Sequence, residues 1–442
     1  MAQSESGGSG WPDVVELLRA LIRFDTTNPP GNETACVEHV RGLLHDAGID
    51  SRILARAENR PNLIARIEGR GEAPPLLLYG HVDVVTTAGQ RWTHPPFGGE
   101  LADGAVWGRG ALDMKGGVAM LVHSFIRAHA DGPPPGDLVL AVLSDEENGG
   151  EFGARFLVEE QPELFEGARH ALGEFGGATV HLGGRSFYPI QVAEKQICWL
   201  RGVVRGPGGH GAIGVRGSAM GKLGRILTAL DDGSLPIHVT PPARAWIEAM
   251  ADALPDGEAR PLRSLLDPAS AEETLRAAGD ELRPIERALR NTVSATIVHG
   301  GEKINVIPSE VELELDGRTL PGFGPDDLIR ELGELVGPEL ELELVRHDPG
   351  PADSDLSFLP TLSSILRELD ADAIPVPMMQ IGVTDGRFFS RIGIQTYGYL
   401  PLKLPEGFEF ARLVHAADER VPADAVRFGA EAVFRAIERY RG

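Results

Sequence analysis

The chain has 442 residues, of which 42% are hydrophobic and 24% charged. This composition is typical of globular proteins, and the length favours two domains over one. The formal net charge of -23 argues against nucleic acids and membranes as partners, because phosphate backbones and anionic lipids would repel the chain. The two cysteines, Cys36 and Cys198, are far apart and in no paired motif, which disfavours a disulfide framework and a thiolate zinc site.

The N-terminal part of the chain predicts alternating helices and strands. Its first residues are polar and lack the features of a signal peptide, and no run of about 18 apolar residues follows, so we expect a cytoplasmic protein. Residues 13–24 and 34–47 show apolar side chains at helical spacing, and a segment with two prolines and a glycine separates them. Two strands, 51–57 and 62–69, are predicted next.

The segment from Leu76 to Val85 combines a buried strand with polar groups at its end. An apolar run after Pro74 and Pro75 predicts the strand, and His81 and Asp83 stand at its carboxyl end. Because they are two residues apart, the two side chains point to the same side of an extended chain. Open α/β sheets build their sites at this edge, so we expect a functional site here.

The same arrangement recurs further along the chain. The apolar run 138–143 predicts a second buried strand that ends in a group of acidic residues, and a weaker third strand ends in one glutamate. A glycine-rich loop with one aspartate precedes a predicted helix at 116–130. Oxygen donors grouped with an imidazole suit zinc, manganese or cobalt, so the pattern predicts a metal site. The acidic residues concerned are Asp113, Asp145, Glu146, Glu147 and Glu174.

The pattern changes near residue 190. Apolar and polar residues alternate through 189–206, which predicts a strand with one exposed face, and similar strands return after residue 290. We therefore expect an α/β fold in which residues 1–190 and 351–442 form a metal-binding domain with a mixed, mostly parallel sheet. Residues 191–350 are expected to form an inserted α+β domain with an antiparallel sheet.

A late histidine, His415, stands in the segment VHAADER, ahead of a closing helix predicted at 423–440. It is more than two hundred residues from the first polar cluster, so only tertiary folding can bring it there.

The adjacent pair Glu146 and Glu147 could have two different roles at a metal site: one holds an ion and the other takes a proton from water.

Seven segments occur together along the chain: GHVDVV, GRGALDMKGG, SDEENGG, GPGGHG, INVIPSE, TDGRFF and VHAADER. Their order resembles that in the aminoacylase / carboxypeptidase G / acetylornithine deacetylase family of co-catalytic zinc hydrolases, and the resemblance covers roughly residues 12–440. It implies an enzyme that uses two divalent metal ions, zinc first and cobalt or manganese as alternatives, to hydrolyse an amide bond next to a free carboxylate.

The resemblance also implies roles for individual residues. Glu146 matches the general base, and Asp83 matches a carboxylate that orients a metal-binding histidine. Asp145 is a further ligand candidate on spacing alone, but the resemblance assigns that role to its neighbour Glu147. The implied ligands are His81, Asp113 and Glu174 for one ion, and Asp113, Glu147 and His415 for the other.

The inserted domain is expected to act as a lid and a dimerisation domain that contacts the substrate. His210 matches a histidine that stabilises the oxyanion, often from a partner subunit. Asn305 and Arg318 match a pair that binds the substrate, with the guanidinium holding its carboxylate, and Arg387 is a second candidate clamp.

The expected substrate is a small molecule or short peptide with a free carboxylate: an N-acyl-amino acid, a dipeptide or the C-terminal residue of a peptide. The long insert at about 235–290 resembles the larger carboxypeptidase-like and acyl-amino-acid hydrolase members more than the compact deacetylases. A homodimer is expected. The alternative is a metal-binding homologue that has lost catalysis and acts through binding or assembly.

Overall fold

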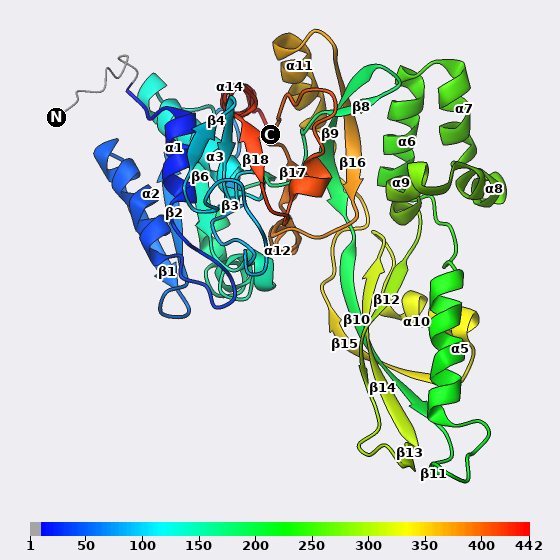
Figure 1. Ribbon diagram of the computed structural model, residues 1–442. Coiled ribbons are helices and arrows are strands. Elements are labelled where there is room, and N and C mark those ends of the chain that lie inside the picture. The colour runs from blue at the N-terminus through cyan, green and yellow to red at the C-terminus, as the bar shows by residue number, and fades with distance from the viewer. Residues whose placement is uncertain (1–9) are drawn as a thin grey trace. The chain divides into compact units, whose positions relative to one another are not determined.

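The computed structural model describes residues 10–442 and divides into two compact units (Figure 1). The first unit comprises the chain up to Val192 together with Asp355–Met378 and Thr384–Gly442. The second unit comprises Ala193–Ser354 and Met379–Val383. Between residues 10 and 442, no helix has both the length and the apolar character needed to cross a membrane.

The first unit is built on a nine-stranded sheet. Its strands are β1 (Ser51–Ala55), β2 (Pro61–Ile67), β3 (Leu76–His81), β6 (Leu138–Leu143), β7 (His170–Gly173), β8 (Val180–Leu182), β9 (Arg185–Glu194), β16 (Ala373–Gln380) and β17 (Gln395–Gly398). Their order is β1-β2-β6-β3-β7-β17-β9-β16, and β8 pairs with β9. The centre is parallel, because β6, β3, β7 and β17 all run in the same direction. A smaller sheet contains β4 (Glu100–Ala102), β5 (Ala105–Trp107) and β18 (Arg420–Pro422).

Helices cover both faces of the central sheet. They are α1 (Val14–Ile22), α2 (Thr34–Asp46), α3 (Lys115–Asp131), α4 (Ala154–Glu160), α11 (Leu359–Leu369), α12 (Gly386–Ser390), α13 (Phe410–Leu413) and α14 (Ala423–Arg439). Successive residues of β3 enter different cores: Leu76 and Leu78 pack with α1, α3 and α14, whereas Leu77 and Tyr79 pack with α4 and α12. This burial of both faces explains why the central strands are continuously apolar.

The second unit has a four-stranded antiparallel sheet of order β12-β14-β10-β15. These strands are β10 (Gln196–Arg205), β12 (Thr292–His299), β14 (Glu310–Thr319) and β15 (Leu340–His347). The helices α5 (Ala219–Asp232) and α10 (Pro325–Val336) pack on one face of it. A separate two-stranded ribbon joins β11 (Gly209–His210) to β13 (Val306–Ile307). The long insert forms α6 (Pro241–Ala253), α7 (Asp256–Ser264), α8 (Pro268–Ala278) and α9 (Arg283–Ala288).

The predicted fold class is confirmed, but the single strand predicted at 189–206 is wrong. β9 ends at Glu194 and β10 begins at Gln196, and the two strands belong to different sheets. Between them, the backbone N–H of Lys195 donates to the carbonyl of Gln380, and its ammonium group donates to the carbonyl of Arg290 at 2.9 Å. The alternation of apolar and polar residues continues across this junction, so the sequence pattern could not reveal it.

Candidate metal centre

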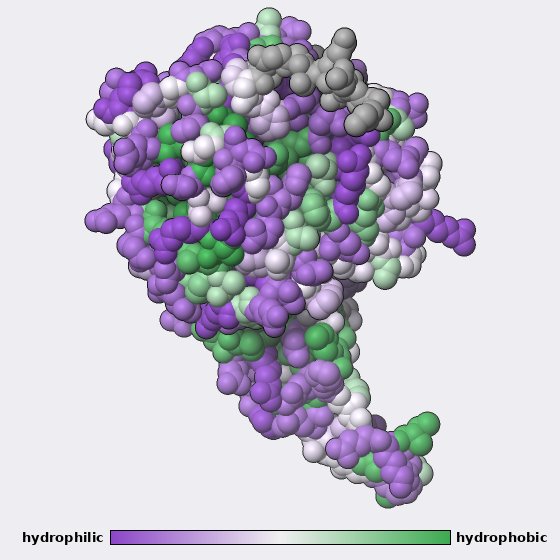
Figure 2. All heavy atoms as spheres, turned by 90° about the vertical axis from the view of Figure 1, so that its left-hand side faces the viewer, coloured by the Kyte–Doolittle hydropathy of each residue, from purple (hydrophilic) through white to green (hydrophobic). Residues whose placement is uncertain are grey.

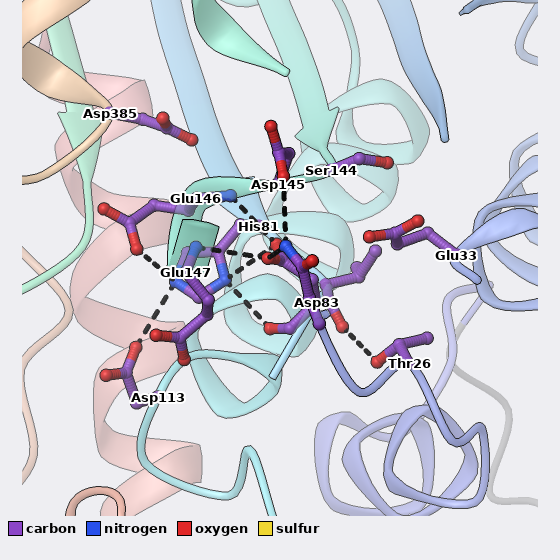
Figure 3. Close-up of polar contacts among 12 residues, drawn as sticks. Thr26, Glu33, His81, Asp83, Asp113, Ser144, Asp145, Glu146, Glu147 and Asp385 are labelled. Carbon is purple, nitrogen blue, oxygen red and sulfur yellow. Dashed lines mark hydrogen bonds and ion pairs between the residues drawn. The ribbon is translucent and has the colours of Figure 1, made fainter. Parts of the chain in front are cut away.

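Three parallel strands end at the same edge of the central sheet and carry acidic or imidazole groups there. His81 is the last residue of β3 and pairs with Leu143, the last residue of β6. Glu146 and Glu147 follow β6 in one turn of 3-10 helix, and Glu174 follows β7 directly. Figure 3 shows the Glu146–Glu147 turn beside His81.

Two groups of side chains within residues 10–442 could each hold a metal ion. The first group contains His81, Asp113 and Glu174, whose ligand atoms lie within 4.8 Å of one another. Nε2 of His81 lies 3.3 Å from Oδ1 of Asp113 and 3.4 Å from Oε2 of Glu174. All three side chains are buried, so this group is enclosed by protein.

The second group contains Asp113, Glu147 and His415. Nε2 of His415 lies 3.1 Å from Oδ2 of Asp113 and 3.3 Å from Oε2 of Glu147. Asp113 therefore offers one carboxylate oxygen to each group, which is the arrangement needed for a bridging ligand. His415 has a positive φ of 63°, a conformation that is uncommon for residues other than glycine and that, where it occurs, is often found at functional sites.

The electrostatics of the two groups fit bound cations. Nε2 of His81, Oε2 of Glu174 and Oε1 of Glu147 are buried without a hydrogen-bond partner. Burial, together with the nearby acidic groups Glu146 and Asp113, raises the pKa of Glu174 to about 8 and that of Glu147 to about 7. Hydrogen bonds to Asp113 and Glu147 raise the pKa of His415 to about 10. Divalent ions would supply the charge that these carboxylates lack.

Glu146, the predicted base, lies beside the first group without belonging to either group. Its Oε2 is 4.0 Å from Nε2 of His81, and its Oε1 is 3.6 Å from Nη1 of Arg387. Burial raises the pKa of Glu146. Arg387 is itself buried, and it donates to the carbonyls of Thr384 at 2.6 Å and Gly149 at 3.1 Å. Arg387 thus faces Glu146 and the backbone around it.

Asp83 supports both His81 and the acidic turn. Its two carboxylate oxygens accept the backbone N–H groups of Glu146 at 3.2 Å and Glu147 at 3.1 Å. Nδ1 of His81 lies 3.0 Å from the backbone oxygen of Asp83. A proton on Nδ1 would make that hydrogen bond and leave Nε2 with a lone pair for a metal ion.

Sequence reasoning missed the pair Arg109 and Glu419, which links the two loops of the second group. Glu419 accepts the backbone N–H of Asp113 at 3.2 Å and pairs with Nη1 of Arg109 at 2.7 Å. Arg109 donates to the backbone oxygen of His415 at 3.1 Å, and both charged side chains are buried.

Asp385 was also missed: its backbone N–H donates to Oε1 of Glu174 at 3.2 Å. Only the positions of these residues inside the recognised motifs could have indicated them.

The residues expected to contact the substrate from the second unit lie at different places within it. His210 pairs with Val306 in the β11–β13 ribbon, and the N–H of Gly211 donates to the carbonyl of Asn305 at 2.9 Å. Arg318 lies near the opposite end of β14, where its guanidinium pairs with Asp316 at 2.8 Å. His210 and Asn305 are thus neighbours, whereas Arg318 is remote from both.

A pocket in the first unit reaches the metal centre. It is a small cavity of about 30 Å³ that opens to solvent, and Asp113 and Glu174 contribute its acidic wall. The remaining side chains are apolar, and none of the lining residues is a lysine or an arginine. The apolar side chains are those of Ala111, Leu112, Met114, Met120, Phe175, Ala178, Leu400, Leu402, Phe410 and Val414.

The fold and the two groups that share an aspartate define the class of protein, a metal-dependent hydrolase of amide bonds. A profile described as "Peptidase family M20/M25/M40" matches residues 77–439, and the chain belongs to this family. The match confirms the family resemblance and the enzyme class inferred from the sequence.

Individual relatives agree with this membership. The chain is 27% identical to a succinyl-diaminopimelate desuccinylase from Paracoccus denitrificans, over 97% of this chain and 98% of that protein. It is 28% identical to a probable carboxypeptidase S-like protein from Dictyostelium discoideum, over 78% of this chain and 68% of the relative. A family M20 metallo-carboxypeptidase from Sulfolobus solfataricus has the same fold, with a TM-score of 0.70 and 15% identity over 97% and 99% of the two chains.

Proposed function

We propose that this protein hydrolyses an amide bond next to a free carboxylate, with two divalent metal ions held by the groups that share Asp113. The observation that carries the proposal is the position of Glu146, adjacent to Glu147 and 4.0 Å from His81, without being part of either ligand group. Zinc is the proposed metal, and cobalt and manganese are the alternatives that the same donor set accepts.

The chemistry divides between the ions and Glu146. When bound, the ions polarise the amide carbonyl and lower the pKa of water to about 7. Glu146 takes the proton of the attacking water and passes it to the leaving nitrogen. Burial raises the pKa of Glu146, which favours its holding the proton taken from water until that proton passes to the leaving nitrogen. Arg387, 3.6 Å from Glu146, keeps that carboxylate oriented.

The second unit is proposed to close on the substrate and to form a homodimer. Within one copy, Arg318 and His210 lie far apart. Eight residues of β14 separate Arg318 from Glu310, at the start of the strand, which is roughly 27 Å at about 3.4 Å per residue. The ribbon that contains His210 lies beyond Glu310. A dipeptide is too short to reach both His210 and Arg318 of the same copy. Placing His210 and Asn305 in the partner's site would remove this conflict.

An apolar surface beside the ribbon supports such a dimer. Ile213, Ile304 and Val306 are exposed next to His210 and Asn305. Figure 2 shows hydrophobic surface at the far end of the second unit, where Figure 1 places β11 and β13. Exposed apolar residues beside functional polar groups favour contact with another protein surface, here a second copy of the chain.

The substrate is proposed to be a cytoplasmic N-acyl-amino acid or short peptide with an apolar group near the scissile bond. The pocket beside Asp113 and Glu174 supports this, because its other side chains are apolar and it contains no cation to pair with an acidic acyl group. A succinyl group, which the Paracoccus denitrificans relative removes according to its name, carries such an acid. No observation favours the alternative of a catalytically silent homologue.

A substrate panel tests the proposal. N-acetyl-, N-hexanoyl- and N-succinyl-amino acids and dipeptides are assayed with the metal-loaded protein, before and after exhaustive chelation. We expect hydrolysis of neutral, apolar substrates, loss of activity on chelation and recovery on addition of Zn²⁺. Preference for the succinyl substrates would overturn the proposed specificity, and hydrolysis that survives chelation would overturn the metal mechanism.

A further inference from the structure

The turn that carries Glu146 and Glu147 begins at a strained residue. Asp145 follows β6 with a positive φ of 73°, a conformation that non-glycine residues rarely adopt without support from their surroundings. Because this residue sets the direction of the chain entering the turn, whatever holds Asp145 also determines where Glu146 and Glu147 lie.

The side chain of Asp145 is fully engaged in this support. Its Oδ1 accepts hydrogen bonds from Nη2 of Arg60 at 2.7 Å and Nδ2 of Asn28 at 3.1 Å, and its Oδ2 accepts the N–H of Phe152 at 3.0 Å. Asp145 is buried and belongs to neither metal-binding group. Its spacing permitted a ligand role, but its contacts give it a structural one.

Asn28 connects this support to the other anchor of the turn. The same Nδ2 that donates to Asp145 also donates to Oδ2 of Asp83 at 2.8 Å. Asp83 in turn accepts the backbone N–H groups of Glu146 and Glu147. The amide group of Asn28 therefore joins the two carboxylates that fix the turn, that of Asp145 at its start and that of Asp83 at the N–H groups of Glu146 and Glu147.

Arg60 is the cation of this network. Its Nη2 pairs with Asp145, and its Nε lies 3.0 Å from Oε2 of Glu33, which is fully buried. Its Nη1 donates to the carbonyl of Pro30 at 3.2 Å. Figure 3 shows Glu33 and Asp145 on the side of Asp83 away from Asp113. A planar guanidinium can make these contacts together, whereas the single ammonium of a lysine cannot.

We propose that Arg60 and Asn28 are positioning residues of the metal centre, which fix the Glu146–Glu147 turn through Asp145 and Asp83. The inference rests on the proposed function only for the part played by Glu146. Glu147 is a member of the second group alone, so a displaced turn weakens the ion held by Asp113, Glu147 and His415. The ion held by His81, Asp113 and Glu174 keeps all its ligands and is affected less, because Nδ1 of His81 lies nearer to the backbone oxygen of Asp83, at 3.0 Å, than to its carboxylate, at 3.4 Å.

The test compares Arg60→Lys and Asn28→Ala with the parent protein by titrating the metal-free chains with Zn²⁺. We expect one of the two equivalents to bind more weakly in each variant, by no more than the about 10- to 100-fold that follows when a direct partner of a metal ligand is changed, and the other to bind nearly as in the parent. In the loaded enzymes kcat should fall while KM changes little, because Glu146 is displaced and substrate contacts are not.

Arg290→Lys is the matched control. Arg290 is also buried and also joins two carboxylates, with Nη2 at 2.8 Å from Glu272 and Nε at 3.2 Å from Glu286, but it lies in the second unit. We expect it to lower the unfolding temperature without changing either zinc equivalent. If Arg60→Lys does not fold, the smaller change Asn28→Ala decides.

Two outcomes would overturn the inference: parent-like zinc binding and kcat in the folded variants, or equal weakening of both equivalents. A parent protein that binds two zinc ions but hydrolyses no amide would contradict the proposed function instead. The zinc titration would still decide whether Arg60 and Asn28 position the turn.

Discussion

Nε2 of His415 lies 3.1 Å from Oδ2 of Asp113, although 302 residues separate the two along the chain. A buried ion pair stabilises the backbone of both residues: Glu419 accepts the backbone N–H of Asp113, and Arg109 donates to the backbone oxygen of His415. The same aspartate faces His81 with its other oxygen. The two groups are therefore parts of one centre, and changes to Asp113 and His415 should have different consequences.

Asp113→Asn should abolish binding of both ions, because the shared carboxylate loses its charge and one of its two oxygen donors. His415→Ala should remove one ion and leave the group of His81, Asp113 and Glu174 occupied. Zinc per chain, measured after dialysis, checks this, with about two expected for the parent, one for His415→Ala and none for Asp113→Asn. Equal loss in both variants would contradict a bridging role.

Glu146→Gln should lower kcat by about 10²- to 10⁴-fold, the usual contribution of a general base, with no loss of metal. The amide cannot take a proton from water, but Glu146 belongs to neither ligand group. Glu151→Gln, an exposed acid shortly after the same turn, is the control and should behave as the parent. Unchanged turnover in Glu146→Gln would exclude it as the base.

Glu419→Gln should destabilise the protein by about 3–5 kcal/mol, the usual cost of breaking a buried ion pair from one side. Arg109 would keep its charge in a buried site without its carboxylate partner. Chemical unfolding of the metal-free chains measures the loss. The double variant Glu419→Gln with Arg109→Met should lose less than the sum of the two single changes, and simple additivity would show that the pair does not act as a unit.

The metal-free protein should lose stability as the pH rises from about 5 to 8. Burial raises the pKa of Glu147 to about 7 and that of Glu174 to about 8 in the folded chain, so both carboxyls bind protons there more tightly than in the unfolded chain. Stability from this source is complete below the unfolded pKa and is lost as the pH passes the folded values. His415, with its pKa raised to about 10, acts in the same direction.

Thermal unfolding of the chelated protein across this pH range measures the effect. Saturating Zn²⁺ should abolish the decline, because the ions bind the ionised carboxylates and keep them charged. A chelated protein that becomes more stable between pH 5 and 8 would contradict the electrostatic description of the centre.

A mixed dimer should show whether His210 acts on the partner's site. His210→Ala and Arg318→Ala should each be nearly inactive alone. If His210 acts in trans and Arg318 in cis, a heterodimer of the two contains one complete site and regains about half of the parent activity per dimer. Co-purified heterodimers carrying two different affinity tags allow the measurement, and no recovery would show that a single copy supplies both residues to each site.

The sequence by itself determined the centre of the fold and most of the acidic groups. The apolar runs at 76–79 and 138–143 could be recognised because parallel strands are buried on both faces, and their carboxyl ends had to meet at one edge. His81, Glu146 and Glu147 follow from this local rule. The break between β9 and β10 at Lys195 could not be predicted, because the alternation of apolar and polar residues is the same on both sides of it.

Only the tertiary structure decided how distant segments complete the centre. His415, Arg109 and Arg60 contact residues far along the chain, and no local periodicity encodes such contacts. The structure also separated the roles of Asp145 and Glu147, which sequence spacing left equivalent. The physical reason is that a buried carboxylate becomes a ligand or a support according to which cation or N–H group folding brings to it, and that depends on the packing of the whole unit.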